Sequence, residues 1–169
     1  TKTTGLVNRL RAMKERPDCD VFWSSEQSAV LLLAREGLLE AYDSPSAKDL
    51  PAHCRGPNQA WTAFGARVRV FIYNTEKVKE KDAPRYLEDL ADPKWKDRAT
   101  VAKPLYGTTR SHLAAYALTV GEEQAFDLFR RWKQNGVRLE AGNAQVRDRV
   151  AAGVYDVGLT DSDAVLAAL

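Results

Sequence analysis

The spacing of apolar residues predicts a helix at the start of the chain. Leu6, Val7, Leu10 and Met13 recur at intervals of one to four residues, as on one face of a helix, and Pro17 ends the pattern. A second helix is expected after a short turn. The apolar run DVFW at 20–23 predicts a strand, the two serines that follow it offer N-caps, and the helix continues through 29–34 to Gly37.

The strongest strand pattern of the chain is WTAFGARVRVFIYN at 61–74. Arg67 and Arg69 fall on one face of this strand, while Val68 and Val70 fall on the other. The rest of the chain alternates between strands and helices. The pattern predicts helices at 84–90, from Thr109 or Ser111, from Gly121, from 143 to Gly153 and from Asp163, and strands at 99–102, 137–140 and 157–159.

Strands separated by helices predict an α/β fold with largely parallel sheets. The charged segment that follows Asn74 has the composition of a boundary between two lobes, which we place as 1–75 and 76–169.

Composition and charge narrow the class of protein. The chain has 169 residues, of which 44% are hydrophobic and 28% charged, as in an ordinary globular protein. The net charge of +2, with basic residues scattered among acidic ones, argues against a nucleic-acid partner. Cys19 and Cys54 follow no pairing pattern, and with two histidines the chain has no zinc-type spacing.

Four turns have the composition of ligand-binding loops, because ligands of open α/β sheets lie where strands run into helix N-termini. Each contains small polar residues that also serve as helix caps, so capping is the competing interpretation of each turn alone. We expect all four at the same sheet edge: 23–26, 103–109 (which includes Gly107, Thr108 and Thr109), 141–143 (which ends at Asn143) and 160–163 (which includes Ser162).

Acidic and phenolic residues in these turns suggest a metal site. Together, Glu26, Asp161, Asp163 and Tyr106 would supply the hard oxygen ligands that a divalent or trivalent cation prefers. The helix dipole alone also accounts for carboxylates at helix starts. Arg67 would neutralise an accompanying anion.

Nucleophilic catalysis finds little support. Ser111 and His112 are adjacent, so their side chains point apart on a helix and form no triad. The chain contains no G-x-S-x-G, P-loop or G-x-G-x-x-G motif. An enzyme or a sensor domain on the same lobes is therefore the alternative from another class, and no catalytic cofactor is expected.

Four phrases together resemble the bacterial periplasmic ferric-iron-binding proteins, which are solute-binding components of ABC transporters in the large family 1 of extracellular solute-binding proteins. The phrases are DVFWSSEQSAVLLLAREGLLEAY, WTAFGARVRVFIYNTEKV, LEDLADPKWKDRATVAKP and NGVRLEAGNAQVRDRVAAGVYDVGLTDSD. The resemblance implies a type II periplasmic binding protein fold, in which two α/β lobes joined by crossover strands trap a ligand in their cleft. The strand at 61–74 would be a crossover, and the chain would be incomplete at both ends.

The resemblance also implies roles for individual residues. Glu26 matches an acidic position of the family, the loop at 107–109 matches the loop that holds a synergistic anion, and Asn143 matches a second anion contact. An ABC permease would be the partner and the periplasm the location, with the signal peptide outside this chain.

The turn at 160–164 departs from the family pattern. Many iron-binding members carry two adjacent tyrosines here, whereas this chain has Thr-Asp-Ser-Asp-Ala. Ferric iron, with or without an anion, therefore competes with a small anionic solute such as a phosphonate, sulfate or carboxylate.

Overall fold

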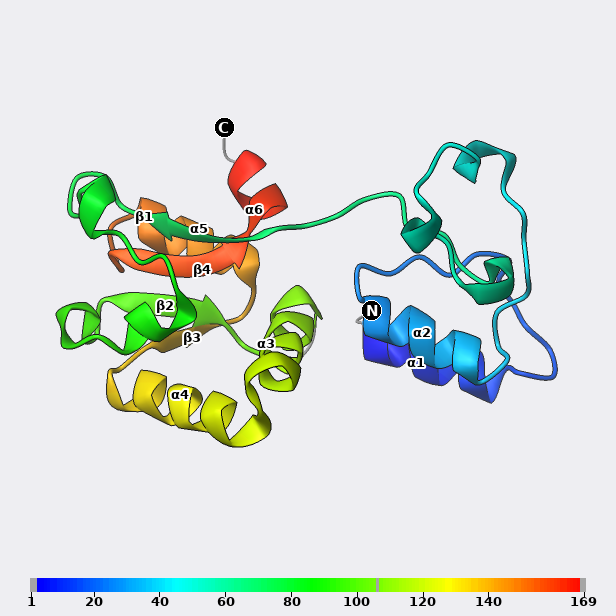
Figure 1. The fold of residues 1–169 in the computed structure, drawn as a ribbon, viewed down its shortest axis with the longest axis horizontal. Helices are drawn as coiled ribbons and strands as arrows, with labels where there is room; N and C mark the ends of the chain where they lie inside the picture. Colours follow the sequence, from blue (N-terminus) through cyan, green and yellow to red (C-terminus); the bar gives the residue numbers. More distant parts are fainter. Residues whose placement is uncertain (1–2, 106, 168–169) are drawn as a thin grey trace. The chain divides into compact units, whose positions relative to one another are not determined.

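The structure, a computed structural model, describes residues 3–105 and 107–167 of the chain. The chain forms two compact units, residues 1–66 and 67–169 (Figure 1). The charged segment predicted a boundary at 75/76, nine residues later than the boundary in the structure. The boundary lies earlier because strand β1 (Arg69–Tyr73) pairs with a strand of the second unit and therefore belongs to that unit.

The first unit is built on two helices, α1 (Thr3–Ala12) and α2 (Gln27–Arg35). Their facing apolar positions form a small core that contains Val7, Ala29 and Leu33. Three short 3-10 helices follow: η1 (Pro45–Ala47), η2 (Ala52–Cys54) and η3 (Pro57–Gln59). The helix predicted before Pro17 and the helix predicted through 29–34 are therefore both confirmed.

The predicted strand at 20–23 is wrong. Its residues form no β-ladder, and Val21 and Trp23 are 79% and 75% exposed. A strand needs a hydrogen-bonding neighbour, and within the described part of this unit the β-pairing is limited to an isolated bridge between Arg55 and Thr62. The two serines do not cap α2 either. Glu26 is the N-cap, while the hydroxyl of Ser24 accepts the Glu26 N–H at 3.0 Å.

The second unit contains a four-stranded sheet in the order β1-β4-β2-β3. Strands β2 (Ala99–Ala102), β3 (Arg138–Glu140) and β4 (Val157–Asp161) are parallel, and β1 pairs with β4 in the antiparallel direction. The predicted α/β class with a largely parallel sheet is confirmed. The parallel strands all end at the same edge, which places the turns that follow them side by side.

Helices pack on this sheet and follow its strands. Helix α3 (Gly107–Val120) packs against α4 (Glu122–Gln134), and α5 (Asn143–Ala151) packs on β4 and β2. Short α6 (Ser162–Leu166) follows β4 (Figure 1). The approach of α5 depends on Gly158, because a Cβ there would lie 2.7 Å from a methyl group of Val146. The main core is apolar and includes Leu90, Trp95, Val101, Leu128, Trp132 and Leu159.

Two predicted elements of this unit differ from the structure. The strand predicted at 61–74 is confined to β1, because β4 ends at Asp161 and the register places Arg69 opposite that residue. The helix predicted at 84–90 is instead a 3-10 helix, η5 (Leu87–Ala91), flanked by η4 (Glu80–Asp82) and η6 (Pro93–Trp95).

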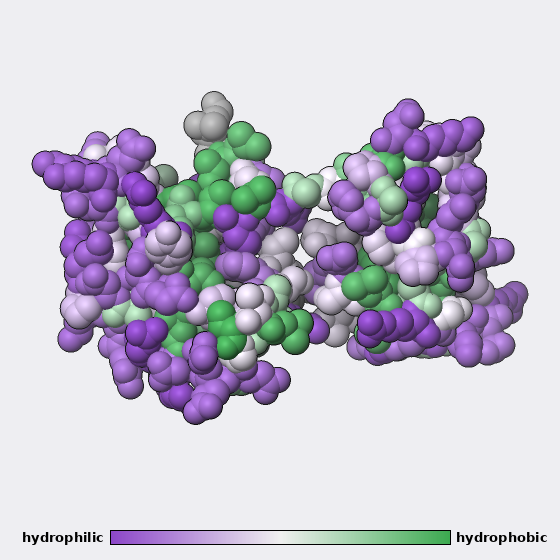
Figure 2. Space-filling view, in the orientation of Figure 1, coloured by the Kyte–Doolittle hydropathy of each residue, from purple (hydrophilic) through white to green (hydrophobic). Residues whose placement is uncertain are grey.

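The surface is mainly hydrophilic on the visible face of each unit (Figure 2). No helix in the described part of the chain is long and apolar enough to cross a membrane. Cys19 and Cys54 are both free thiols, and Cys19 is exposed.

Candidate functional site

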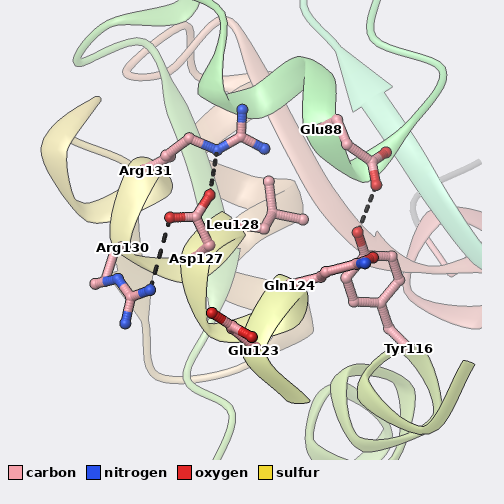
Figure 3. Close-up of a pocket in the computed structure, with 8 residues that line it drawn as sticks. All are labelled: Glu88, Tyr116, Glu123, Gln124, Asp127, Leu128, Arg130 and Arg131. Atoms are coloured by element: carbon pink, nitrogen blue, oxygen red, sulfur yellow. Dashed lines mark hydrogen bonds and ion pairs between the residues drawn. The ribbon is translucent and has the colours of Figure 1, made fainter. Parts of the chain in front are cut away.

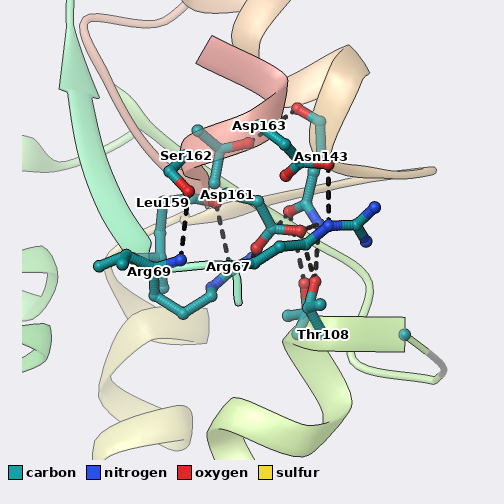
Figure 4. A network of polar contacts seen from close by, with 12 residues as sticks. Arg67, Arg69, Thr108, Asn143, Leu159, Asp161, Ser162 and Asp163 are labelled. Atoms are coloured by element: carbon teal, nitrogen blue, oxygen red, sulfur yellow. Dashed lines mark hydrogen bonds and ion pairs between the residues drawn. The ribbon is translucent and has the colours of Figure 1, made fainter. Parts of the chain in front are cut away.

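The carboxyl edge of the parallel sheet brings three of the four predicted turns together. Strand β2 leads to the start of α3, β3 leads to the start of α5, and β4 leads into α6. Side chains from these starts converge on the end of β4 (Figure 4). The fourth turn, at 23–26, belongs to the first unit.

Asp161 is the centre of this convergence. The residue is 2% exposed, and its carboxylate forms an ion pair with Arg69 of β1. It also accepts hydrogen bonds from the hydroxyl of Thr108 at 2.5 Å and from the amide of Asn143 at 2.7 Å. Three donors from three elements therefore satisfy the carboxylate, and the buried charge is compensated.

Asn143 links the remaining parts of the network. Its side-chain oxygen accepts a hydrogen bond from Arg69 at 3.0 Å, and its main-chain carbonyl accepts one from Thr160 at 3.0 Å. Its amide also donates to the Thr108 hydroxyl at 3.1 Å, while Thr109 lies at 3.5 Å from its side-chain oxygen. The starts of α3 and α5 are thus fixed to the ends of β1 and β4.

A second ion pair lies beside this network. The Nε of Arg67 is 2.9 Å from a carboxylate oxygen of Asp163, and these side chains are 42% and 49% exposed. Between the two pairs, the N–H of Ser162 donates to the carbonyl of Val68 at 2.9 Å, and the Ser162 hydroxyl accepts the Val68 N–H at 3.2 Å. Ser162 therefore extends the β1–β4 pairing beyond the end of β4.

Not every predicted ligand is placed in this site. Tyr106 lies outside the described residues. Glu26 is a buried residue of the first unit, at 4% exposure. Gly107 begins α3 with a positive φ of 68°. The described residues contain no cluster of three or more His, Cys, Asp or Glu side chains arranged to hold a metal ion.

Two residues of the site were not predicted from the sequence. Arg69 was assigned to the same strand face as Arg67, but its burial and its contact with Asp161 depend on β4. His112 lies one helical turn after Thr108 on α3, and its Nδ1 is buried without a hydrogen-bond partner among the described residues. Helical spacing from Thr108 was the available signal for His112.

His112 should make folding stability depend on pH. Burial, and next the positive charge of Arg69, lower the pKa of His112, while the charge of Asp161 opposes this effect. Below about pH 6.5, the ordinary pKa of histidine, the unfolded chain therefore binds a proton that the folded chain does not. We expect the wild type to lose stability from pH 7 to pH 5 more steeply than His112→Asn, as measured by urea denaturation. The same change in unfolding free energy from pH 7 to pH 5 for the wild type and for His112→Asn would contradict this expectation.

A separate groove of about 510 Å³ lies between η5, α3 and α4 (Figure 3). Several of its polar side chains are paired with one another: Tyr116 donates to Glu88, and Arg130 and Arg131 contact Asp127. Burial, and next the hydrogen bond to Glu88, raise the pKa of Tyr116 to about 12.

Comparison with known proteins agrees with this architecture. Iron uptake protein A2 of Synechocystis is 32% identical over 152 residues, which covers 86% of this chain and 40% of that protein. Iron-bound HitA from Pseudomonas aeruginosa matches with a TM-score of 0.87 and 29% identity, over 95% of this chain and 52% of that one. AfuA from Actinobacillus pleuropneumoniae, solved with fructose-6-phosphate, matches with a TM-score of 0.73 and 25% identity, over 95% and 53%.

The chain spans about half the length of the relatives that it matches. Over that half, the predicted type II periplasmic binding protein fold is confirmed. The model of one family, described as a bacterial extracellular solute-binding protein, matches residues 17–166. The chain therefore belongs to the family of bacterial extracellular solute-binding proteins.

Proposed function

We propose that this chain is part of a periplasmic solute-binding protein that delivers ferric iron to an ABC importer. The observation that carries the proposal is the likeness to iron-bound HitA, at a TM-score of 0.87 and 29% identity. Relatives named for iron uptake and ferric-iron binding support it. The protein would bind and release its cargo without chemical change, and its partner would be the membrane permease.

The geometry favours Asp163 over Asp161 as a carboxylate ligand in the second unit. Asp161 is buried and accepts three side-chain donors, so a metal would have to displace them. The Asp163 side chain is 49% exposed, and among the described residues its ion-pair partner is Arg67. Carboxylate oxygens suit a hard trivalent cation. Glu26 and Tyr106 remain proposed ligands from the other turns.

An accompanying anion would find its donors at the same sheet edge. The proposed set comprises one cationic side chain and polar groups at the two helix starts and in the turn after β4. These residues are Arg67, Gly107, Thr108, Thr109, Asn143 and Ser162. Main-chain N–H groups at helix starts and guanidinium groups bind anions well.

We expect the full-length gene product to bind ferric iron and to melt at a higher temperature with ferric citrate than with citrate alone. A ligand present at 100 times its Kd adds about 2.7 kcal/mol to the stability. Asp163→Asn should weaken iron binding, as measured by elemental analysis after dialysis and by thermal denaturation. Asp148→Asn is the matched control, because Asp148 is an exposed carboxylate on α5 that pairs with Arg147. Equal melting temperatures with and without ferric ion would refute the proposal.

A second candidate is a small anionic solute such as a sugar phosphate. The absence of tyrosine at 160–164 favours it, as does the likeness to AfuA solved with fructose-6-phosphate. Calorimetry of the iron-free protein with phosphate, sulfate, a phosphonate and fructose 6-phosphate separates the two candidates. Tight binding of one of these anions, without iron binding, would favour the second.

A further inference from the structure

Two arginine–aspartate pairs follow one another along the β1–β4 pairing. The register places Arg69 opposite Asp161. The two hydrogen bonds between Val68 and Ser162 continue this pairing, so that Arg67 meets Asp163 one step beyond. We refer to Arg69–Asp161 as the inner pair and to Arg67–Asp163 as the outer pair (Figure 4).

The two pairs differ in burial and therefore in what holds them closed. The inner side chains are 11% and 3% exposed, and further hydrogen bonds from Thr108 and Asn143 support them. The outer side chains are 42% and 49% exposed. An exposed ion pair adds little to stability, whereas breaking a buried one leaves an uncompensated charge. A ligand can therefore open the outer pair far more easily than the inner pair.

We infer that the outer pair sets the balance between cation binding and anion binding at this site. The inference rests on the proposed function, because it concerns the same sheet edge. While the pair is closed, Arg67 neutralises the carboxylate that a cation requires, and Asp163 neutralises the guanidinium that an anion requires. A bound cation takes Asp163 and releases Arg67. A bound anion does the reverse.

Removing one partner should therefore favour one class of ligand and disfavour the other. Arg67→Gln leaves Asp163 without its cation, so the site gains affinity for cations and loses affinity for anions. Asp163→Asn leaves Arg67 without its carboxylate, so the opposite changes follow. An exposed charge pair is worth at most about 1 kcal/mol, which corresponds to changes of up to about fivefold in each affinity.

The test uses two separate probes on the full-length gene product. Terbium(III) is a hard trivalent cation with a luminescence readout, and inorganic phosphate, followed by calorimetry, is the anion. We expect Arg67→Gln to bind terbium more tightly and phosphate more weakly than the wild type, and Asp163→Asn to do the opposite. Arg131→Gln and Asp127→Asn are matched controls, because that half-exposed pair on α4 lies 3.4 Å apart and outside the site. Both controls should leave both affinities unchanged.

The inference would be overturned if the two variants changed the affinity for a probe in the same direction, or if neither variant changed it. Thermal denaturation verifies that each variant is folded. Failure of the proposed function looks different. A wild type that binds neither ferric ion nor terbium refutes the iron proposal. The inference then still requires Arg67→Gln to gain terbium binding and Asp163→Asn to gain phosphate binding.

Discussion

Arg69→Met is expected to lower the free energy of unfolding by about 3–5 kcal/mol, because it leaves the buried Asp161 carboxylate without its counter-charge. The Arg69 and Asp161 side chains are 11% and 3% exposed, so water cannot replace the lost partner. The hydrogen bonds from Thr108 and Asn143 remain, but neither donor carries a charge. Urea denaturation followed by circular dichroism measures the loss.

The matched control is Arg67→Met, which removes the outer arginine. Its side chain is 42% exposed and faces a half-exposed carboxylate, so we expect a loss below about 1 kcal/mol. The double variant Arg69→Met/Asp161→Leu should recover much of the stability, because it removes both buried charges. Equal losses of unfolding free energy for Arg69→Met and Arg67→Met would show that the inner pair does not stabilise the fold more than the outer pair.

Trp132→Ala is expected to have an effect of similar size, about 3–5 kcal/mol, because it removes a large side chain from the main core. Trp132 is 5% exposed on α4, and its indole N–H donates to the carbonyl of Leu87 at 2.9 Å. The substitution leaves a cavity and deprives that carbonyl of its donor. The midpoint of urea denaturation gives the loss directly.

Phe126→Ala provides the comparison on the same helix. Phe126 is 57% exposed, so its removal should cost less than about 1 kcal/mol. The loss of stability for Trp132→Phe should lie between those of Trp132→Ala and Phe126→Ala, because phenylalanine keeps most of the packing but lacks the indole N–H. If Phe126→Ala were as destabilising as Trp132→Ala, the core would not lie where we place it.

The elements of the second unit were largely predictable, because each carries its own periodic signal. The stretch at 99–102 is apolar and bounded by charged residues, and it forms the fully buried strand β2. Gly121 was expected to start a helix and is the N-cap of α4. These signals are local, so they survive in any tertiary context that buries the apolar face.

The lengths of strands were less predictable. The alternating pattern runs from 61 to 74, but β1 begins at Arg69, because the available partner strand ends at Asp161. The apolar run at 20–23 finds no partner within the described part of the first unit and remains irregular. Pairing is a property of two segments, and one segment alone does not determine it.

The sequence by itself determined which turns carry the polar groups of the site, because strand ends and helix starts are encoded locally. It therefore identified Asp161, Asp163, Thr108 and Asn143 as candidates. Only the tertiary structure decided their partners and their burial. The register of β1 on β4 buries Arg69 against Asp161 and leaves Arg67 with Asp163 at the surface. Two arginines that are equivalent in the strand pattern thus differ in burial, because the burial of Arg69 depends on a partner that lies 92 residues away in the chain.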